Sequence, residues 1–381
     1  METIVVSHKI RLVPNQMQEE YFRKACGTAR FTYNWGLAEW KRQYENGQKP
    51  SAYSLKMLFN RIKKEQFPWV AEVTKCAPEQ AFADLQRAFV NFFRKNARYP
   101  NFKKKGRSKD SFYLSNDKFE INGKKVRIPK LGWVRMRETL RFSGKILSAR
   151  VSRDADQWYI AIQVEIARPT PPTKNHGTVG MDVGLNCFAA LSTGEKVLAP
   201  KPLRNHLKRL KKLQRRHARK QRGSQNRKKH ITKLARLHLR IRNIRSDFLH
   251  KLSHRMTTSC KQIAIEDLNI KGMVKNHRLA LSISDAGWGE FRRQLSYKTD
   301  WYGSSLYVVD RWFPSSKTCS QCGSIKDTLS LSERLYVCVC GNKMDRDVNA
   351  AVNLKLAATG GYPESNACGH SDRCAAAGLA V

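Results

Sequence analysis

The chain has 381 residues, of which 41% are hydrophobic, and its formal net charge at pH 7 is +41. Its length fits two or three domains, each with its own core. A positive charge this large repels itself in a compact protein unless a polyanion neutralises it, so nucleic acid is a better explanation than a basic surface made only for solubility. No stretch approaches the roughly 20 apolar residues of a membrane span, and the N-terminus lacks the apolar core of a signal peptide. We therefore expect a cytoplasmic protein with no membrane partner and with reduced cysteines.

The first part of the chain is expected to combine a small β-barrel with inserted helices. Residues 4–13 alternate loosely between apolar and polar side chains, which predicts a strand. Residues 15–97 carry apolar side chains at helical spacing, and most of their aromatic residues are expected to be core. Short β-like runs separated by turns fill residues 98–172, a pattern typical of a small barrel. The N-terminal strand, within residues 1–14, would join that barrel.

A basic loop lies at the start of the second β-rich stretch. It runs from Arg98 to Gly106, with proline and glycine as chain breakers. Lys103, Lys104 and Lys105 are consecutive in this loop. Because a polyanion is the expected partner, these three lysines are candidate nucleic-acid contacts.

Residues 201–245 form the most strongly charged part of the chain, with 19 Lys or Arg and no Asp or Glu. Two stripes of leucine and isoleucine, separated by a turn at Gly223, predict a helical hairpin with one apolar and one basic face. A merely solvated face would carry acids among the bases, so nucleic-acid contact is the better interpretation. The bases of the first helix that form one stripe along a phosphate backbone are Arg204, Lys208, Lys211, Arg215 and Arg219.

Two acids occupy strands that are otherwise apolar. Asp182 lies within a strand, between Gly180 and Gly184, which would allow the close approach of a ligand or another backbone. Glu266 ends a short buried strand. Taken singly, such acids are more often structural than functional.

A third acid, Asp347, opens a helix and shares its face with Ala350, Ala351 and Leu354, a face suited to packing on a sheet. The neighbouring Asp345 is expected to be the helix cap. Asp182, Glu266 and Asp347 could thus meet at the edge of an α/β sheet. Hard oxygen donors of this kind suit Mg²⁺ or Mn²⁺, and paired ions can clamp both oxygens of a phosphodiester under attack.

Four cysteines follow the pattern of a zinc ribbon: Cys319, Cys322, Cys338 and Cys340. A pair, a hairpin-sized spacer and a second pair favour Zn²⁺ bound by four thiolates, a closed and therefore structural site. The second pair is C-x-C where C-x-x-C is usual, so free or partly oxidised thiols remain the alternative.

Together these residues resemble the TnpB family of transposon-encoded, RNA-guided DNA endonucleases, relatives of type V CRISPR effectors. The similarity runs from about residue 8 to residue 357, nearly the whole chain. The matching stretches are Arg30–Asn34, Asn101–Gly106, Gly180–Gly184, Ile265–Leu268, Leu281–Trp288, Phe313–Gly323 and Asp345–Ala351.

The resemblance implies a multidomain α/β fold with a β-barrel. A wedge β-barrel (1–14 and 98–172) would carry an inserted helical recognition domain (15–97). A RuvC-type, RNase H-like nuclease domain (173–313 and 344–359) would carry the zinc ribbon (314–343), and residues 360–381 would form a structureless tail.

The same resemblance implies a monomer in complex with a guide RNA and double-stranded target DNA. Asp182, Glu266 and Asp347 would be its catalytic acids, and cleavage would occur next to a short target-adjacent motif. Base pairing would supply the sequence specificity, while the protein holds the backbone.

Two other functions stay open. An RNA-guided repressor that no longer cuts would fit the same binding surfaces, but it is disfavoured because all three acids are present. A DNA-strand transferase ranks last because no tyrosine or serine recombinase constellation is visible in the sequence.

Overall fold

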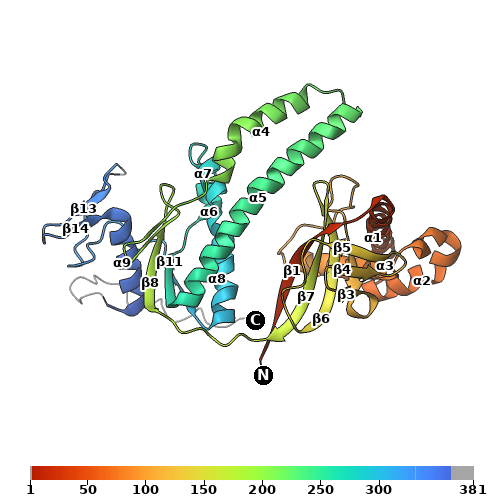
Figure 1. Cartoon of the computed structure of the whole chain (residues 1–381), viewed down its shortest axis with the longest axis horizontal. Helices are drawn as coiled ribbons and strands as arrows, with labels where there is room; N and C mark the ends of the chain where they lie inside the picture. The colour runs from red at the N-terminus through yellow and green to blue at the C-terminus, as the bar shows by residue number, and fades with distance from the viewer. Residues whose placement is uncertain (1, 331, 362–381) are drawn as a thin grey trace. The chain divides into compact units, whose positions relative to one another are not determined.

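The computed structural model describes residues 2–330 and 332–361 (Figure 1). The chain divides into two compact units, the first ending at Arg168 and the second beginning at Pro169. Each unit has its own sheet and its own hydrophobic core. Among the described residues, no helix is both long and apolar enough to cross a membrane. Except for its first two residues, the tail predicted over 360–381 lies outside the described residues.

The first unit is built on a seven-stranded antiparallel sheet in the order β2-β6-β7-β1-β5-β4-β3. Its strands are β1 (Thr3–Val13), β2 (Ser111–Ser115), β3 (Glu120–Asn122), β4 (Lys125–Ile128), β5 (Gly132–Met136), β6 (Lys145–Asp154) and β7 (Gln157–Ala167). β1 is central, since it pairs with β7 along most of its length and with β5 at its last two residues. Every second residue of β1 is buried, which agrees with the predicted alternation.

The expected barrel is not closed by hydrogen bonds. The two edges of the sheet are β2 and β3, and no pairing joins them within the part of the chain that the structure describes. These edge strands are five and three residues long, so they offer little backbone for a closing pair. The N-terminal strand does join the later strands, as predicted, but in an open sheet.

Three helices lie between β1 and β2 in the sequence: α1 (Gln16–Glu45), α2 (Ala52–Gln66) and α3 (Cys76–Phe93). Two short 3-10 helices follow α2 and β2: η1 (Pro68–Glu72) and η2 (Asn116–Lys118). The helical core is aromatic, with Trp40 stacked on Phe89 at a ring-centroid distance of 4.1 Å. Gly36 lets α1 approach α3, because a Cβ there would already lie 3.1 Å from Leu85. Most of the predicted aromatic run is therefore core.

The second unit contains a five-stranded mixed sheet in the order β10-β9-β8-β11-β12. Its strands are β8 (His176–Val183), β9 (Ala189–Leu191), β10 (Lys196–Val197), β11 (Cys260–Glu266) and β12 (Ser305–Val309). β8, β11 and β12 are parallel, whereas β9 runs antiparallel beside β8 and β10 runs antiparallel beside β9. Parallel neighbours need long crossovers, which are the helices α4 (Pro202–Ala218), α5 (Gln225–Ser259), α6 (Ile270–Met273), α7 (Ala280–Ala286) and α8 (Trp288–Tyr302).

Residues 285–302 carry apolar side chains at the spacing of one continuous helix, but the structure divides them between two helices. α7 ends and α8 begins at Gly287, whose φ of +75° favours glycine. Arg245 and Leu249 of α5 also lie close to this glycine, so a side chain there would be crowded. The apolar spacing continues through the break, which is why it did not reveal the kink.

The two faces of the second sheet are covered by different helices. The large core that includes α5, α7 and α8 buries the side chains of Val179, Met181, Ile263 and Ile265. Because side chains alternate along a strand, the other face carries Gly180, Asp182, Ala264 and Glu266. That face is covered by α9 (Arg346–Thr359), whose Leu354 packs in a small core with Ala264.

Gly180 marks the closest approach of α9 to the sheet. A Cβ on Gly180 would lie 1.9 Å from the carbonyl oxygen of Ala351 and 2.6 Å from the backbone nitrogen of Lys355. Backbone atoms cannot move aside as a flexible side chain can. The backbone of α9 therefore lies directly on β8 only because residue 180 has no side chain.

Gly180→Ala should destabilise the second unit by at least the roughly 1–3 kcal/mol typical of overpacking, because α9 must move off the strand. Gly177→Ala on the same strand is the matched control, since a Cβ there meets open space. Urea unfolding of the two variants measures the difference. Equal midpoints for both variants would contradict the contact.

Candidate functional site

The three candidate carboxylates lie on the α9 side of the second sheet. β8 and β11 are parallel neighbours in which Met181 is opposite Ile265, so the next residues are Asp182 and Glu266. Asp347 lies in the first turn of α9. All three side chains are partly buried. The fold thus brings together two strand residues and a helix residue that are far apart in the sequence.

The electrostatic environment of Asp182 disfavours its charge. Burial raises the pKa of Asp182 to about 8, and the carboxylates of Asp347 and Glu266 add to the shift. The pKa of Glu266 is also raised, by burial and by the neighbouring Asp267. Arg346 partly offsets these effects, and its Nε lies 3.7 Å from Asp347 Oδ1. No hydrogen bond or ion pair from a described residue neutralises Asp182 itself.

Asp345 has the capping role that the sequence predicted for it. Its Oδ1 accepts hydrogen bonds from the backbone N–H groups of Asp347, at 3.1 Å, and Val348, at 3.2 Å. Its other oxygen accepts a hydrogen bond of 2.6 Å from Lys196 Nζ on β10. Burial alone would raise the pKa of Asp345, but the hydrogen bond and charge of Lys196 and the two backbone hydrogen bonds together leave it lowered.

Asp267, the residue after Glu266, is also fully partnered. It forms ion pairs with Arg292 of α8 and with Arg311, which follows β12. Hydrogen bonds from these two arginines lower the pKa of Asp267. Of the two consecutive acids, Asp267 is therefore neutralised, whereas Glu266 has no cationic partner among the described residues.

The four candidate thiols converge. Cys319 Sγ lies 3.7 Å from Cys340 Sγ, and Cys322 Sγ lies 3.6 Å from Cys338 Sγ. Among the residues described, they form the one group of three or more possible ligands whose atoms all lie within 4.8 Å of one another. The carboxylates of Asp182, Glu266 and Asp347 do not form such a group. The cysteine cluster fits a bound metal ion.

The C-x-C spacing does not prevent this convergence, because tight turns follow both pairs. Gly323 and Gly341, with φ of +76° and +89°, donate backbone hydrogen bonds to the carbonyls of Cys319 and Cys338. Although burial opposes ionisation, hydrogen bonds from Asn342 and from backbone N–H groups lower the pKa of Cys319 to about 6. The ribbon strands β13 (Leu335–Val337) and β14 (Lys343–Asp345) flank the second pair.

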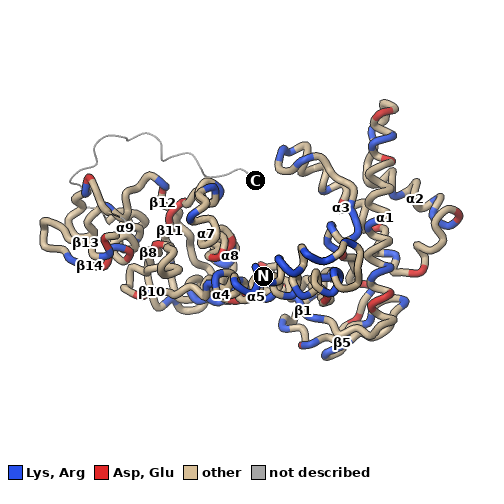
Figure 2. The backbone as a smooth tube through the Cα atoms, turned by 90° about the horizontal axis from the view of Figure 1, so that it is seen from above, with Lys and Arg blue, Asp and Glu red and all other residues tan. Residues whose placement is uncertain are grey.

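The predicted basic hairpin is formed by α4 and α5, and α5 continues to Ser259, beyond the predicted end at 245. Leu210 on α4 packs against Leu237 and Ile241 on α5. Figure 2 shows Lys and Arg along both helices. The stripe predicted on the first helix is exposed to solvent at every position: Arg204, Lys208, Lys211, Arg215 and Arg219.

The base of the hairpin is fixed by a residue that sequence reasoning missed. Asp285 is buried, and its carboxylate accepts hydrogen bonds of 2.9 Å from the backbone N–H groups of Leu203 and Arg204. It also pairs with Arg245 of α5 at 3.1 Å. The local cap position, Lys201, has a φ of +41° and provides no side-chain cap. The sequence feature that could have revealed Asp285 is a helix start without a local capping residue. The capping residue lies 82 residues away in the sequence, so it could not be identified from local pattern.

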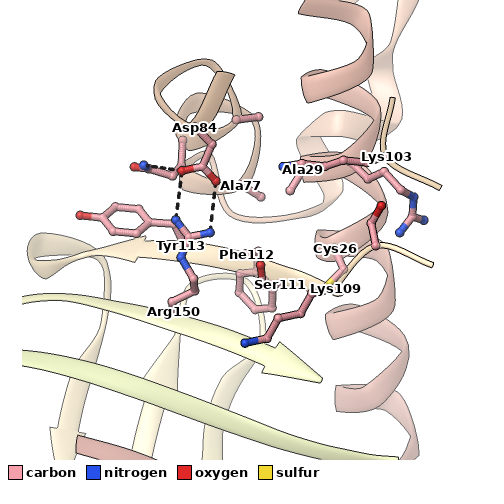
Figure 3. A pocket seen from close by; sticks show the side chains of 14 residues that line it. Cys26, Ala29, Ala77, Asp84, Lys103, Lys109, Ser111, Phe112, Tyr113 and Arg150 are labelled. Atoms are coloured by element: carbon pink, nitrogen blue, oxygen red, sulfur yellow. Dashed lines mark hydrogen bonds and ion pairs between the residues drawn. The ribbon is translucent and has the colours of Figure 1, made fainter. Parts of the chain in front are cut away.

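The three candidate lysines of the first unit differ. Lys103 Nζ lies 3.7 Å from the ring centroid of Tyr33, and its backbone exchanges two hydrogen bonds with the Asn34 side chain. Burial lowers the pKa of Lys103, which lines the pocket shown in Figure 3. Lys104 and Lys105 are exposed. Lys103 is thus engaged within the protein, while its neighbours face solvent.

Comparisons with known proteins place this geometry in a family. A model described as a probable transposase matches residues 161–277, a Cas12f1-like TNB domain matches 288–354, and a helix-turn-helix domain matches 1–49. A protein of Streptomyces pristinaespiralis is 37% identical over 380 residues, covering 98% of this chain and 93% of the relative. The chain belongs to the TnpB family. The resemblance inferred from the motifs is confirmed.

Another relative is similar to this chain over most of its length. InsQ of Escherichia coli (strain K12) is 34% identical to this chain, and the alignment covers 92% of this chain and 91% of InsQ. InsQ and the Streptomyces protein are both provisionally named RNA-guided DNA endonucleases. The fold resembles that of Cas12f1 in a cryo-EM complex with sgRNA and target DNA, at a TM-score of 0.54 and 16% identity, covering 90% of this chain and 83% of Cas12f1. In this TnpB chain, the helix-turn-helix match spans strand β1 and the single long helix α1.

The raised pKa of Asp182 predicts a pH-dependent loss of stability. The folded state binds a proton on Asp182 more tightly than the unfolded state does. Protonation of Asp182 therefore contributes fully to the free energy of unfolding below about pH 4, and this contribution is lost as pH rises to about 8. In EDTA, Asp182→Asn should be more stable than the wild type at pH 8.5 by at least about 1 kcal/mol, and this gap should shrink at pH 5. Urea unfolding at both pH values measures it. Asp247→Asn, at an exposed site on α5, is the control, and a gap independent of pH would contradict the prediction.

The thiol cluster predicts one tightly bound metal ion per chain, measurable by elemental analysis of protein purified without added metal. Replacing both Cys319 and Cys322 by serine should remove the ion and lower the melting temperature. Cys260→Ser, at a buried cysteine outside the cluster, should leave the metal content unchanged. Metal-free wild-type protein with the same melting temperature as the double variant would overturn the assignment.

Proposed function

We propose that this TnpB chain is an RNA-guided endonuclease that cuts double-stranded DNA complementary to a bound guide RNA, next to a short target-adjacent motif. Asp182, Glu266 and Asp347 would be its catalytic acids. The observation that carries the proposal is the meeting of these three carboxylates on one face of a sheet, with Asp182 unneutralised by any described residue. The names of the relatives suggest the nucleic acids involved.

The donor set fits a divalent cation, Mg²⁺ or Mn²⁺, because all three side chains offer hard oxygen atoms. When bound, such a cation stabilises charge on a phosphodiester and lowers the pKa of a coordinated water. The chain's own contribution is to hold the acids. Asp182 on β8 is flanked by Glu266 on β11, while Asp347 approaches from α9. A metal cation and a proton compete for Asp182, because both bind the same carboxylate and the cation requires its deprotonated form.

Contacts to cationic side chains distinguish the acids with structural roles from the candidate catalytic acids. Asp345 caps α9 and binds Lys196, and Asp267 is held by two arginines. An acid with these contacts is poorly available to a metal ion. Glu266 and Asp347 are therefore better candidates than the acids beside them in the sequence.

We assign the second unit to a RuvC-type, RNase H-like nuclease domain over residues 173–313 and 344–359. The ribbon over 314–343 would be its insert. The first unit would comprise the wedge (1–14 and 98–172) and the helical recognition domain (15–97). In support, three helices interrupt the seven-stranded sheet between β1 and β2, and the five-stranded sheet carries the acids.

The ion in the ribbon would be Zn²⁺, held by Cys319, Cys322, Cys338 and Cys340. Sulfur separations of 3.6 and 3.7 Å match the edge of about 3.8 Å in a tetrahedron with Zn–S bonds of about 2.3 Å. Four thiolates leave no open position, so this site would be structural.

The guide RNA and its DNA partner would lie along the basic stripe of α4. Five exposed bases without a described acidic partner suit a phosphate backbone and not a base-specific contact. Lys104 and Lys105 are further candidate phosphate contacts, whereas Lys103, packed on Tyr33, would help to hold their loop. The complex would contain one copy of the chain.

The test uses the full chain purified with its RNA. Sequencing that RNA gives the guide, and a matched duplex in Mg²⁺ is the substrate. Alanine at Asp182, Glu266 or Asp347 should abolish cleavage, by at least roughly 100-fold, while RNA and target binding persist, because the acids hold the cation and not the backbone. Asp345→Asn is the matched control, since asparagine also caps helices, and it should still cut.

Two outcomes would change the assignment. If Asp345→Asn stopped cleavage and Asp347→Ala did not, the third acid would be misassigned. If the wild type bound the matched duplex but did not cut it in Mg²⁺ or Mn²⁺, a guided DNA-binding protein would replace the nuclease.

A further inference from the structure

Trp312 presents its indole to solvent just beyond the edge strand of the carboxylate sheet. At 84% exposed, it is the most exposed of the eight tryptophans, and the next, Trp133, is 40% exposed. It follows β12 by three residues, and the last residue of β12, Val309, is level with Glu266 in the parallel pairing. The indole is therefore carried by the loop that leaves the sheet beside a candidate catalytic acid.

One end of this loop is fixed to the strand that carries Glu266. Arg311 forms an ion pair with Asp267, the residue that follows Glu266. The backbone N–H of Trp312 donates a 2.8 Å hydrogen bond to the carboxylate of Asp310. The segment just before the indole is thus held by charged groups of the sheet edge.

The other end of the loop is fixed to the helix that carries Asp347. Phe313 packs in the small core beneath α9 together with Leu354. The carbonyl of Ser315 accepts a 2.8 Å hydrogen bond from the buried Asn353 side chain of α9. The two consecutive aromatic residues therefore differ in burial: Phe313 packs in the core and anchors the loop, whereas Trp312 is exposed to solvent.

An isolated exposed apolar side chain is common on protein surfaces and by itself indicates nothing. This one differs in its attachment. Leaving a large apolar side chain in water forgoes the favourable free energy that its burial would contribute. Trp312 remains exposed although its loop is fixed both beside β11, which carries Glu266, and to α9, which carries Asp347. The chain has a net charge of +41, so it suits a polyanion. A nucleobase is the flat apolar surface that a polyanion would bring there.

We propose that Trp312 stacks on a nucleobase of the DNA strand that enters the carboxylate site. This inference rests on the proposed nuclease function. Every base has a π-face, so the contact is independent of sequence. A base already stacked within a duplex has no free face, so Trp312 selects an unpaired segment. Because the loop is fixed to both acid-bearing elements, the stacked base sets which phosphodiester lies at the acids.

The experiment combines a protein change with a base deletion. The full chain with its co-purified guide RNA cuts matched duplexes in which one nucleotide near the cut is replaced, position by position, by an abasic analogue. Trp312→Leu removes the π-face and keeps apolar bulk, and Trp312→Phe restores a ring. Trp133→Leu removes an exposed indole from the other unit. Melting temperatures of the variants check folding.

Trp312→Leu should slow cleavage on the order of tenfold, and Trp312→Phe and Trp133→Leu should stay near wild type. At one position the abasic analogue should slow the wild type by a similar factor and should not slow Trp312→Leu further. Cut positions should scatter in Trp312→Leu. In Ca²⁺, 2-aminopurine at that position should be quenched by the wild type and not by Trp312→Leu.

Each contrary result has a distinct meaning. If Trp312→Leu cut at the wild-type rate and positions, or if its effect multiplied with the abasic effect at every position, base stacking on Trp312 would be overturned. If the wild type cut nothing, the proposed nuclease function would fail. A scan of 2-aminopurine over the same positions, comparing wild type with Trp312→Leu, would then still decide whether Trp312 stacks on a base.

Discussion

The second unit depends on the backbone of α9 lying directly on β8 at Gly180. This contact brings the first turn of α9, and with it Asp347, to the face that carries Asp182 and Glu266. The helix is held from its other side by the cysteine ribbon. Asn349 and Asn353 are buried, and both donate hydrogen bonds to the carbonyl of Thr318, just before the first cysteine. A metal ion in the ribbon would therefore also fix the helix that completes the carboxylate cluster.

In two places of the second unit, ionisable side chains lack a described partner of opposite charge, and both places are where a polyanion and its cations would act. The carboxylate cluster has acids that no described base neutralises, and the α4 stripe has bases without a described acidic partner. Other acids close to these regions are paired, as Asp267, Asp285 and Asp345 are. Asp285 fixes the base of the α4 stripe, because it caps α4 and binds α5 from α7, the helix that precedes α8.

Local patterns in the sequence correctly predicted most strands and helices, the core aromatics, the capping role of Asp345 and the family. They failed where a distant contact decides the local structure. The helix break at Gly287 lies against Arg245 and Leu249 of another helix, and the cap of α4 comes from Asp285. The open sheet follows from edge strands too short to close a barrel.

The sequence by itself singled out the candidate residues for the chemistry, because carboxylates in apolar strands, paired cysteines and uninterrupted runs of bases are unusual enough to stand out without coordinates. It could not decide which neighbouring acid is neutralised. Asp267 and Glu266 are adjacent in the sequence, and only the positions of Arg292 and Arg311 separate their roles. Nor did the C-x-C spacing show that four sulfurs converge, since two glycine turns made that possible. Charge pairing and close approach depend on distances between segments far apart along the chain, and these exist only once the tertiary structure has formed.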